Sequence, residues 1–264
     1  MKNEFTQYTC VAFYGFAVTA STAVHCYERM LQWFAQKGCP PDRMGVKGEG
    51  FSGKLLDFSR PSAKLKKNGF RGVASVEIHS KPPSECPTSV DGRMMADLSI
   101  VREYAILSAE SLLVPFEAML DIAHAVVQHL KPCYGIGYQR NRRLGPSFYA
   151  LGINYGTQGV FSGPEYEEKV RISSWIEGMS QHVYRQGLLR DVYPYNFLTE
   201  AHLFRNVAGL PLNEWIQKDS GRGRLVPFSG NMSLWSVDQV AIPQVCEDLH
   251  REGIIFDAMR HLNL

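Results

Sequence analysis

The sequence has 264 residues, of which 45% are hydrophobic and 20% are charged, and its formal net charge is +2. A chain of this size buries roughly 70–75% of the surface that its unfolded form exposes, so it can form a core without cross-links. The ordinary apolar content and the low net charge exclude an intrinsically disordered chain. Neither half of the sequence has the clustered basic excess of a nucleic-acid-binding protein, so we expect no direct nucleic-acid partner.

The N-terminal segment Cys10–Val18 is apolar and is followed by the small residues of Thr19–Ser21. This pattern faintly resembles a signal peptide, but Tyr14 and Gly15 interrupt the apolar run, so a buried first strand is the favoured interpretation. No segment reaches the ~18 apolar residues that a membrane span needs. We therefore expect a soluble, cytoplasmic protein with no membrane partner. Its six cysteines have no paired short spacing, so free thiols are expected.

The first half of the chain alternates strand and helix patterns. Periodicity predicts strands at Tyr8–Val18, at Gly72–Ser80 and, as one bent strand or two, at Met94–Ser108. It predicts helices at Thr19–Gly38, capped by Thr19 or Ser21, and at Val114–Lys131. Lys64–Lys67 is a short basic patch that ends at a turn signal, Asn68-Gly69, and Lys81–Gly92 is predicted to be a loop.

The second half predicts shorter elements. Strands are expected at Tyr134–Tyr138, Phe148–Tyr155, Leu225–Phe228, Met232–Val237 and, at a sheet edge, Ile254–Phe256. Helices are expected at Pro164–Gln186, Glu200–Asn206 and Pro243–Glu252, with an aromatic loop at Tyr193–Phe197. Helices mixed irregularly with hairpins indicate an α+β fold, with antiparallel or mixed sheets and helices packed on one face. The Gly- and Ser-rich segment 156–164 suggests two lobes, residues 1–155 and 156–264, although one continuous domain fits equally well.

One motif satisfies the pattern GxGxxG, at Gly48–Gly53. This pattern binds nucleotides only where a strand leads into it and a helix leaves it, so that amide groups point at phosphate. The sequence before Gly48 leaves room for few strand residues, and the segment after Lys54 ends at Arg60-Pro61. A glycine-rich turn is therefore the favoured interpretation, and no cofactor is expected.

No residue pattern marks an active site or a metal centre. His124 and His129 are five residues apart on a predicted helix, which places them on different faces, and no HExxH or GxSxG motif is present. We therefore expect no catalytic residues and no metal ligands, and we expect that the protein is not an enzyme. A site assembled from distant residues is the alternative, and its sign would be titratable groups that converge with shifted pKa values.

Two segments are candidates for binding a partner. One is the basic turn with Arg140, Arg142 and Arg143, and the other is the aromatic segment with Tyr193, Tyr195 and Phe197. Arginine and tyrosine dominate interface hot spots, so these six residues are the predicted contact residues. The alternatives are a solvated turn for the arginines and a core beneath a loop for the aromatic rings.

Spaced aromatic and glycine positions over about residues 110–264 resemble an immunity protein family of bacterial polymorphic toxin systems. The residues that carry the resemblance are Tyr134–Tyr138, Tyr149–Ile153, Leu189–Leu198, His202, Leu203, Gly209, Leu212–Ile216, Gly221–Phe228, Leu234–Val237 and Gly253–Phe256. Members of this family are encoded beside toxins with a restriction-endonuclease-like nuclease domain, including effectors of the type VI secretion system.

The resemblance implies a protein that binds a cognate nuclease toxin and neutralises it in the producing cell. It supplies no functional residues, so the six contact residues rest on residue type alone. Two other classes of function stay open: an enzyme with a dispersed active site, and a module that binds a nucleic acid or a scaffold through the basic turn and Lys64, Lys66 and Lys67.

Overall fold

The computed structural model describes residues 6–80, 92–153 and 164–261, which form two compact units. Unit 1 comprises Met1–Pro132 and Gln139–Ser147, and unit 2 comprises Cys133–Tyr138 and Phe148–Leu264. Both units combine antiparallel strands with helices, which confirms the predicted α+β class. The predicted division into lobes 1–155 and 156–264 stays a prediction.

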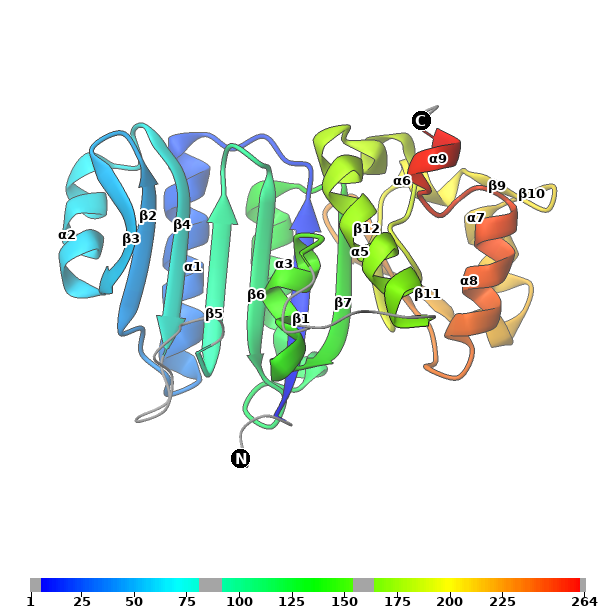
Figure 1. The fold of residues 1–264 in the computed structure, drawn as a ribbon, viewed down its shortest axis with the longest axis horizontal. Helices are drawn as coiled ribbons and strands as arrows, with labels where there is room; N and C mark the ends of the chain where they lie inside the picture. Colours follow the sequence, from blue (N-terminus) through cyan, green and yellow to red (C-terminus); the bar gives the residue numbers. More distant parts are fainter. Residues whose placement is uncertain (1–5, 81–91, 154–163, 262–264) are drawn as a thin grey trace. The chain divides into compact units, whose positions relative to one another are not determined.

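Unit 1 is built on antiparallel strands in the order β1-β6-β5-β4-β2-β3 (Figure 1). Their bounds are β1 Gln7–Tyr14, β2 Arg43–Gly48, β3 Phe51–Asp57, β4 Val73–Ser80, β5 Met94–Ser99 and β6 Tyr104–Glu110. The helices are α1 Ala20–Gln36, α2 Ser59–Asn68 and α3 Phe116–Leu130. Helices α1 and α3 pack against each other and lie behind the strands in Figure 1.

Helix α1 has the N-terminal cap and the apolar periodicity that allowed its prediction from the sequence. Its N-cap Thr19 accepts a hydrogen bond from the backbone N–H of Thr22, and the Thr22 hydroxyl accepts one from the backbone N–H of Thr19. This reciprocal pair satisfies two amide groups that a helix start leaves without partners. Behind the cap, the apolar stripe that includes Met30 and Phe34 is buried. Cap and stripe together fix the helix.

Unit 1 contains a helix and a hairpin that the sequence analysis did not predict. Lys64 and Lys67 of the basic patch lie within α2, and the turn signal Asn68-Gly69 coincides with the end of this helix. Gly48–Gly53 belongs to the β2–β3 hairpin, with Gly48 at φ +143 and only 2.3 Å between a Cβ built there and the Gly72 carbonyl oxygen. A strand therefore leaves this motif, not a helix, which confirms a glycine-rich turn.

Unit 2 contains antiparallel strands in the order β11-β12-β8-β7, a separate β9–β10 ribbon and several short helices. The strands are β7 Tyr134–Asn141, whose last residues belong to unit 1, β8 Tyr195–Leu198, β9 Asn206–Val207, β10 Leu210–Pro211, β11 Arg224–Ser229 and β12 Met232–Ser236. The helices are α4 Pro146–Ala150, which begins in unit 1, α5 Pro164–Ser180, α6 Glu200–Leu203, α7 Leu212–Gln217, α8 Ile242–Arg251 and α9 Ala258–His261. Short 3-10 turns are η1 Arg142–Leu144, in unit 1, and η2 Val183–Gln186 and η3 Ser220–Arg222.

Three predictions for the second half were wrong. The expected strand at Phe148–Tyr155 begins as helix α4, and residues 154 and 155 lie outside the described residues. The expected loop at Tyr193–Phe197 contains the start of β8. The expected edge strand at Ile254–Phe256 is a single parallel bridge between Ile255 and Leu189.

Candidate functional site

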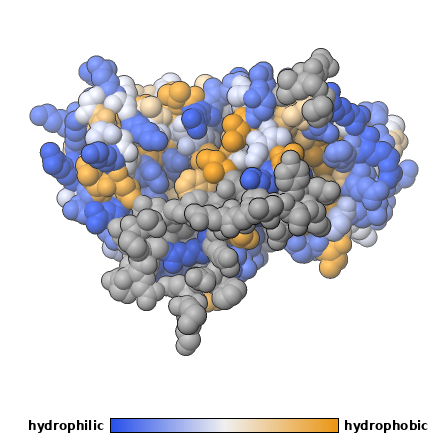
Figure 2. Space-filling model, in the orientation of Figure 1, coloured by the Kyte–Doolittle hydropathy of each residue, from blue (hydrophilic) through white to orange (hydrophobic). Residues whose placement is uncertain are grey.

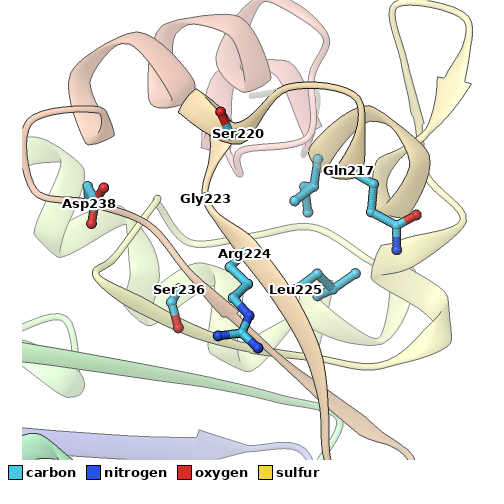
Figure 3. A pocket seen from close by; sticks show the side chains of 8 residues that line it. Gln217, Ser220, Gly223, Arg224, Leu225, Ser236 and Asp238 are labelled. Carbon is cyan, nitrogen blue, oxygen red and sulfur yellow. The ribbon is translucent and has the colours of Figure 1, made fainter.

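A hollow of about 500 Å³ opens on the surface of unit 2, between α7, η3 and the paired ends of β11 and β12 (Figure 3). Residues that line it include Ile216, Gln217, Ser220, Arg224, Ser236 and Asp238. Ile216 is buried, whereas Gln217, Ser220, Arg224 and Asp238 are exposed. The hollow therefore has an apolar base and a polar, charged rim.

Gly223 shapes this hollow. Its backbone has φ +95, and a Cβ built there would lie 2.2 Å from the Ser236 carbonyl oxygen, so only glycine fits against β12. The Trp235 indole N–H donates to the Arg222 carbonyl oxygen at 2.8 Å, and the Asp219 side chain accepts from the Gly221 N–H at 2.8 Å. These contacts fix the chain that leads into β11.

The arginines on either side of Gly223 have different environments. Arg222 donates to the Trp215 carbonyl oxygen at 2.7 Å, and its guanidinium carbon lies 4.1 Å from the Trp215 ring centroid. Arg224 is exposed, and within the described residues its guanidinium makes no hydrogen bond, ion pair or ring contact. Arg222 is a structural residue, whereas Arg224 presents its charge to the rim of the hollow.

A row of side chains leads from this rim across the unit 2 sheet. Arg224 on β11 is directly opposite Ser236 on β12, which is directly opposite Tyr195 on β8. Directly opposed residues share a face of a sheet, so all three side chains lie on the same face. Figure 3 shows Arg224 and Ser236 extending from adjacent strands. Tyr195, a predicted contact residue, is half-buried and is therefore in part accessible.

The other two predicted aromatic contact residues lie in the core. Phe197 has no exposed surface and packs edge-to-face against Phe228, with ring centroids 5.0 Å apart. Tyr193 is 5% exposed, and its hydroxyl shares a 3.1 Å hydrogen bond with the Tyr149 hydroxyl. Neither side chain presents a contact surface in this structure. For these two residues the structure favours the alternative, a core beneath the chain.

Buried Asn196 fixes the backbone on either side of Tyr195. Its side-chain oxygen accepts from the Tyr193 N–H at 3.0 Å, and its side-chain nitrogen donates to the Tyr193 and Trp235 carbonyl oxygens at 2.7 and 3.3 Å. Asn196 therefore ties the chain before β8 to β12, and Tyr195 faces the opposite side of the sheet from Asn196.

The predicted arginines belong to unit 1. Arg140, at the end of β7, is half-buried, and its Nε donates to the Leu144 carbonyl oxygen at 3.4 Å. Half-buried Arg142 begins η1, and its backbone N–H donates to the Thr6 carbonyl oxygen at 2.9 Å. Arg143 follows in the same turn. Their role in binding stays a prediction.

Unit 1 carries a cluster of titratable residues that sequence reasoning missed. Glu77 on β4 is directly opposite Asp97 on β5. The Glu77 carboxylate lies 2.6 Å from Nε2 of buried His79, and the Tyr104 hydroxyl donates to Asp97 at 3.1 Å. These residues lie on three strands and up to 27 positions apart in sequence, so only the register brings them together.

The pKa values of the two carboxyl groups in this cluster are shifted in opposite directions. Burial, and then the negative charge of Glu77, raise the pKa of Asp97 to about 7. Burial opposes ionisation of Glu77, but the hydrogen bond and charge interaction with His79, together with Lys47, outweigh it and lower the Glu77 pKa. Near neutral pH the cluster thus holds an ionised carboxylate beside a carboxyl group that can release or accept a proton.

Arg190 forms a second structural centre that the sequence did not reveal. It is 4% exposed, and its guanidinium donates to the carbonyl oxygens of Tyr149 at 2.7 Å and Ala150 at 3.2 Å. The next residue, Asp191, pairs with Arg171 at 3.2 Å and accepts from the Cys246 thiol at 3.1 Å. Arg190 and Asp191 therefore hold unit 2 together from within.

The other chemical expectations can be compared with the described residues. Cys10, Cys26, Cys39, Cys133 and Cys246 are free thiols, as expected, and Cys86 lies outside the described part. Burial, and then the Asp191 charge, raise the Cys246 pKa to about 12. Among the described residues no three His, Cys, Asp or Glu side chains form a group that could hold a metal ion. None of the helices built from these residues combines the length and apolar character needed to cross a bilayer.

Comparison with known proteins gives a likeness of fold. No protein family matches the sequence, and no curated protein matches it. The fold is similar to the solved structure of the Pseudomonas aeruginosa T6SS protein PA0821, with a TM-score of 0.55 and 10% sequence identity. The match covers 95% of this chain and 73% of that protein. At this identity the likeness is one of fold.

Proposed function

We propose that this protein acts in a type VI secretion system as an immunity protein, which binds a cognate nuclease toxin and neutralises it in the cytoplasm of the producing bacterium. The observation that carries the proposal is the fold likeness to a type VI secretion protein over 95% of the chain. The sequence resemblance over residues 110–264 supports it, because it points to the same biological setting by a different route.

The physical requirements of immunity set the expected mode of binding. A lethal enzyme must be held at low concentration, which requires nanomolar affinity, about −12 kcal/mol. Such affinity needs an interface of about 1,600 Å² with a well-packed centre. The net charge of +2 argues against imitation of DNA in the nuclease cleft, so we expect shape-specific contact.

The genes beside this one provide the test: one of them should encode a nuclease toxin, and that nuclease is then co-expressed with this protein. The wild-type protein should restore growth, and it should bind a catalytically inactive form of the nuclease with nanomolar affinity in titration calorimetry. Growth arrest despite full expression, with no measurable binding, would refute the proposal.

A second candidate function is acid–base catalysis at the titratable cluster, favoured by the raised Asp97 pKa beside Glu77. The two candidates separate in the same assay. A binding protein should protect equally well with Asp97→Asn and Glu77→Gln, whereas an enzyme that repairs or modifies a target should lose protection with either variant.

A further inference from the structure

The rim of the unit 2 hollow carries two charged side chains, those of Arg224 and Asp238. Within the described residues, neither the guanidinium of Arg224 nor the carboxylate of Asp238 makes a hydrogen bond or an ion pair, and both residues are exposed. In Figure 3 Asp238 lies on the segment that follows β12, away from the Arg224 guanidinium. The hollow thus offers one cationic and one anionic contact point.

The backbone around these charges is held in place. Arg224 begins β11 and pairs with Ser236, and Gly223 fits closely against β12. The Asp238 carbonyl oxygen accepts from the N–H groups of Ala241 at 2.8 Å and Ile242 at 3.2 Å at the start of α8. A charge on a fixed backbone loses less entropy when it meets a partner, so both positions are suited to specific contact.

The chemistry of the rim excludes several occupants. A nucleic acid would meet Asp238 beside a single available arginine, whereas phosphate binding uses clustered cations. Small molecules favour enclosed pockets that bury most of their surface, whereas this hollow is open to solvent and has charged side chains at its rim. Addition of a strand to the outer edge of β11 is disfavoured by Pro227, which lacks an N–H group.

We propose that the Tyr195–Ser236–Arg224 row and the adjoining hollow form the docking surface for the toxin, and that the toxin contributes a turn with an acidic side chain opposite Arg224 and a basic side chain or free backbone N–H opposite Asp238. This inference rests on the proposed function. Tyr195 supplies aromatic area beside the charges, and Tyr and Arg are typical of interface hot spots. In the view of Figure 2 the surface over α8, at the right, is mostly hydrophilic.

The test uses charge reversal with a matched control. Arg224→Glu should weaken binding of the catalytically inactive nuclease from the adjacent gene by at least about 30-fold, because it replaces a centrally placed attraction with repulsion. Arg71→Glu makes the same charge change at an exposed position on unit 1 whose side chain has no partner among the described residues, and it should change the affinity less than threefold. Asp238→Lys should weaken binding independently of Arg224.

The outcomes separate the docking surface from the function. Thermal unfolding of each variant checks the fold, and both rim residues are exposed, so we expect unchanged midpoints. If the wild type binds with nanomolar affinity but Arg224→Glu and Asp238→Lys stay within threefold of it, the docking surface is wrong and the immunity function stands. If the wild type neither binds nor protects, both proposals fail.

Discussion

Asp97 makes the pH dependence of stability a direct test of the structure. Its carboxyl group is part-exposed on β5, opposite Glu77, and accepts a hydrogen bond from the Tyr104 hydroxyl. Burial and the Glu77 charge raise its pKa from 3.8 to about 7. The substitution Asp97→Asn removes the charge and keeps an oxygen that can accept the hydrogen bond from Tyr104.

The sign of the effect follows from which state holds the proton more tightly. The folded protein keeps the Asp97 proton up to about pH 7, whereas the unfolded chain loses it near pH 3.8. The stability from the neutral carboxyl is therefore present below about pH 4 and is lost as the pH rises through 7. At about 1.4 kcal/mol per pH unit the loss is at most about 4 kcal/mol. Because water reaches the side chain, we expect about 1–2 kcal/mol.

Urea unfolding of the wild type and Asp97→Asn between about pH 5 and pH 8 measures this loss. As the pH rises across this range, the wild type should lose about 1–2 kcal/mol of unfolding free energy that the variant does not lose. Carbon-13 NMR of the Asp97 carboxyl supplies a control, since Glu77→Gln removes a neighbouring negative charge and should lower the Asp97 pKa. Parallel stability curves for the two proteins would show that Asp97 titrates normally and that the cluster is misjudged.

Three further substitutions test unit 2. Burial lowers the His202 pKa to about 3, so the stability of the wild type should fall by up to about 5 kcal/mol as the pH drops below 6.5. His202→Gln should flatten this fall in acid-unfolding curves. An unchanged slope would contradict a buried neutral imidazole. Gly187→Ala should lower the free energy of unfolding in urea by more than about 2 kcal/mol, because a Cβ built there lies 2.1 Å from the Ala201 carbonyl oxygen. The control Gly209→Ala, also at positive φ but in open space, should lower it by only about 1 kcal/mol. Equal losses would refute the close approach at Gly187. Arg190→Lys keeps the charge but loses the forked geometry that reaches two carbonyl groups, so the thermal midpoint should fall by several degrees. A midpoint equal to that of the wild type would show that Arg190 does not stabilise the core.

Long periodic elements could be predicted from the sequence because local pattern and tertiary packing agree in them. α1 and α3 each have a clear apolar periodicity, and the structure buries the apolar faces. The prediction failed where local signals conflict with packing. Phe148–Ala150 has the β-rich composition of a strand but forms the end of helix α4, which Arg190 binds through its last carbonyl groups from about 40 residues away.

The aromatic segment shows why a strand was predicted to be a loop. Tyr193, Tyr195 and Phe197 recur at every second position, which is the period of a strand, but Pro194 and Asn196 are turn formers and favoured a loop. The buried Asn196 amide resolves the conflict by fixing the turn and the strand together.

The register between paired strands decides which side chains lie next to each other, and this register cannot be derived from a single sequence. Arg140, Arg142 and Arg143 lie close together in the sequence, and so do Arg222 and Arg224. Only the fold separates the last two, because strand pairing sets Arg224 beside Ser236 and Tyr195, whereas Arg222 is held by Trp215. The same reasoning applies to Glu77 and Asp97, which become a pair only through β4 and β5. Strand pairing, and not closeness in the sequence, therefore decides which of these side chains can act together.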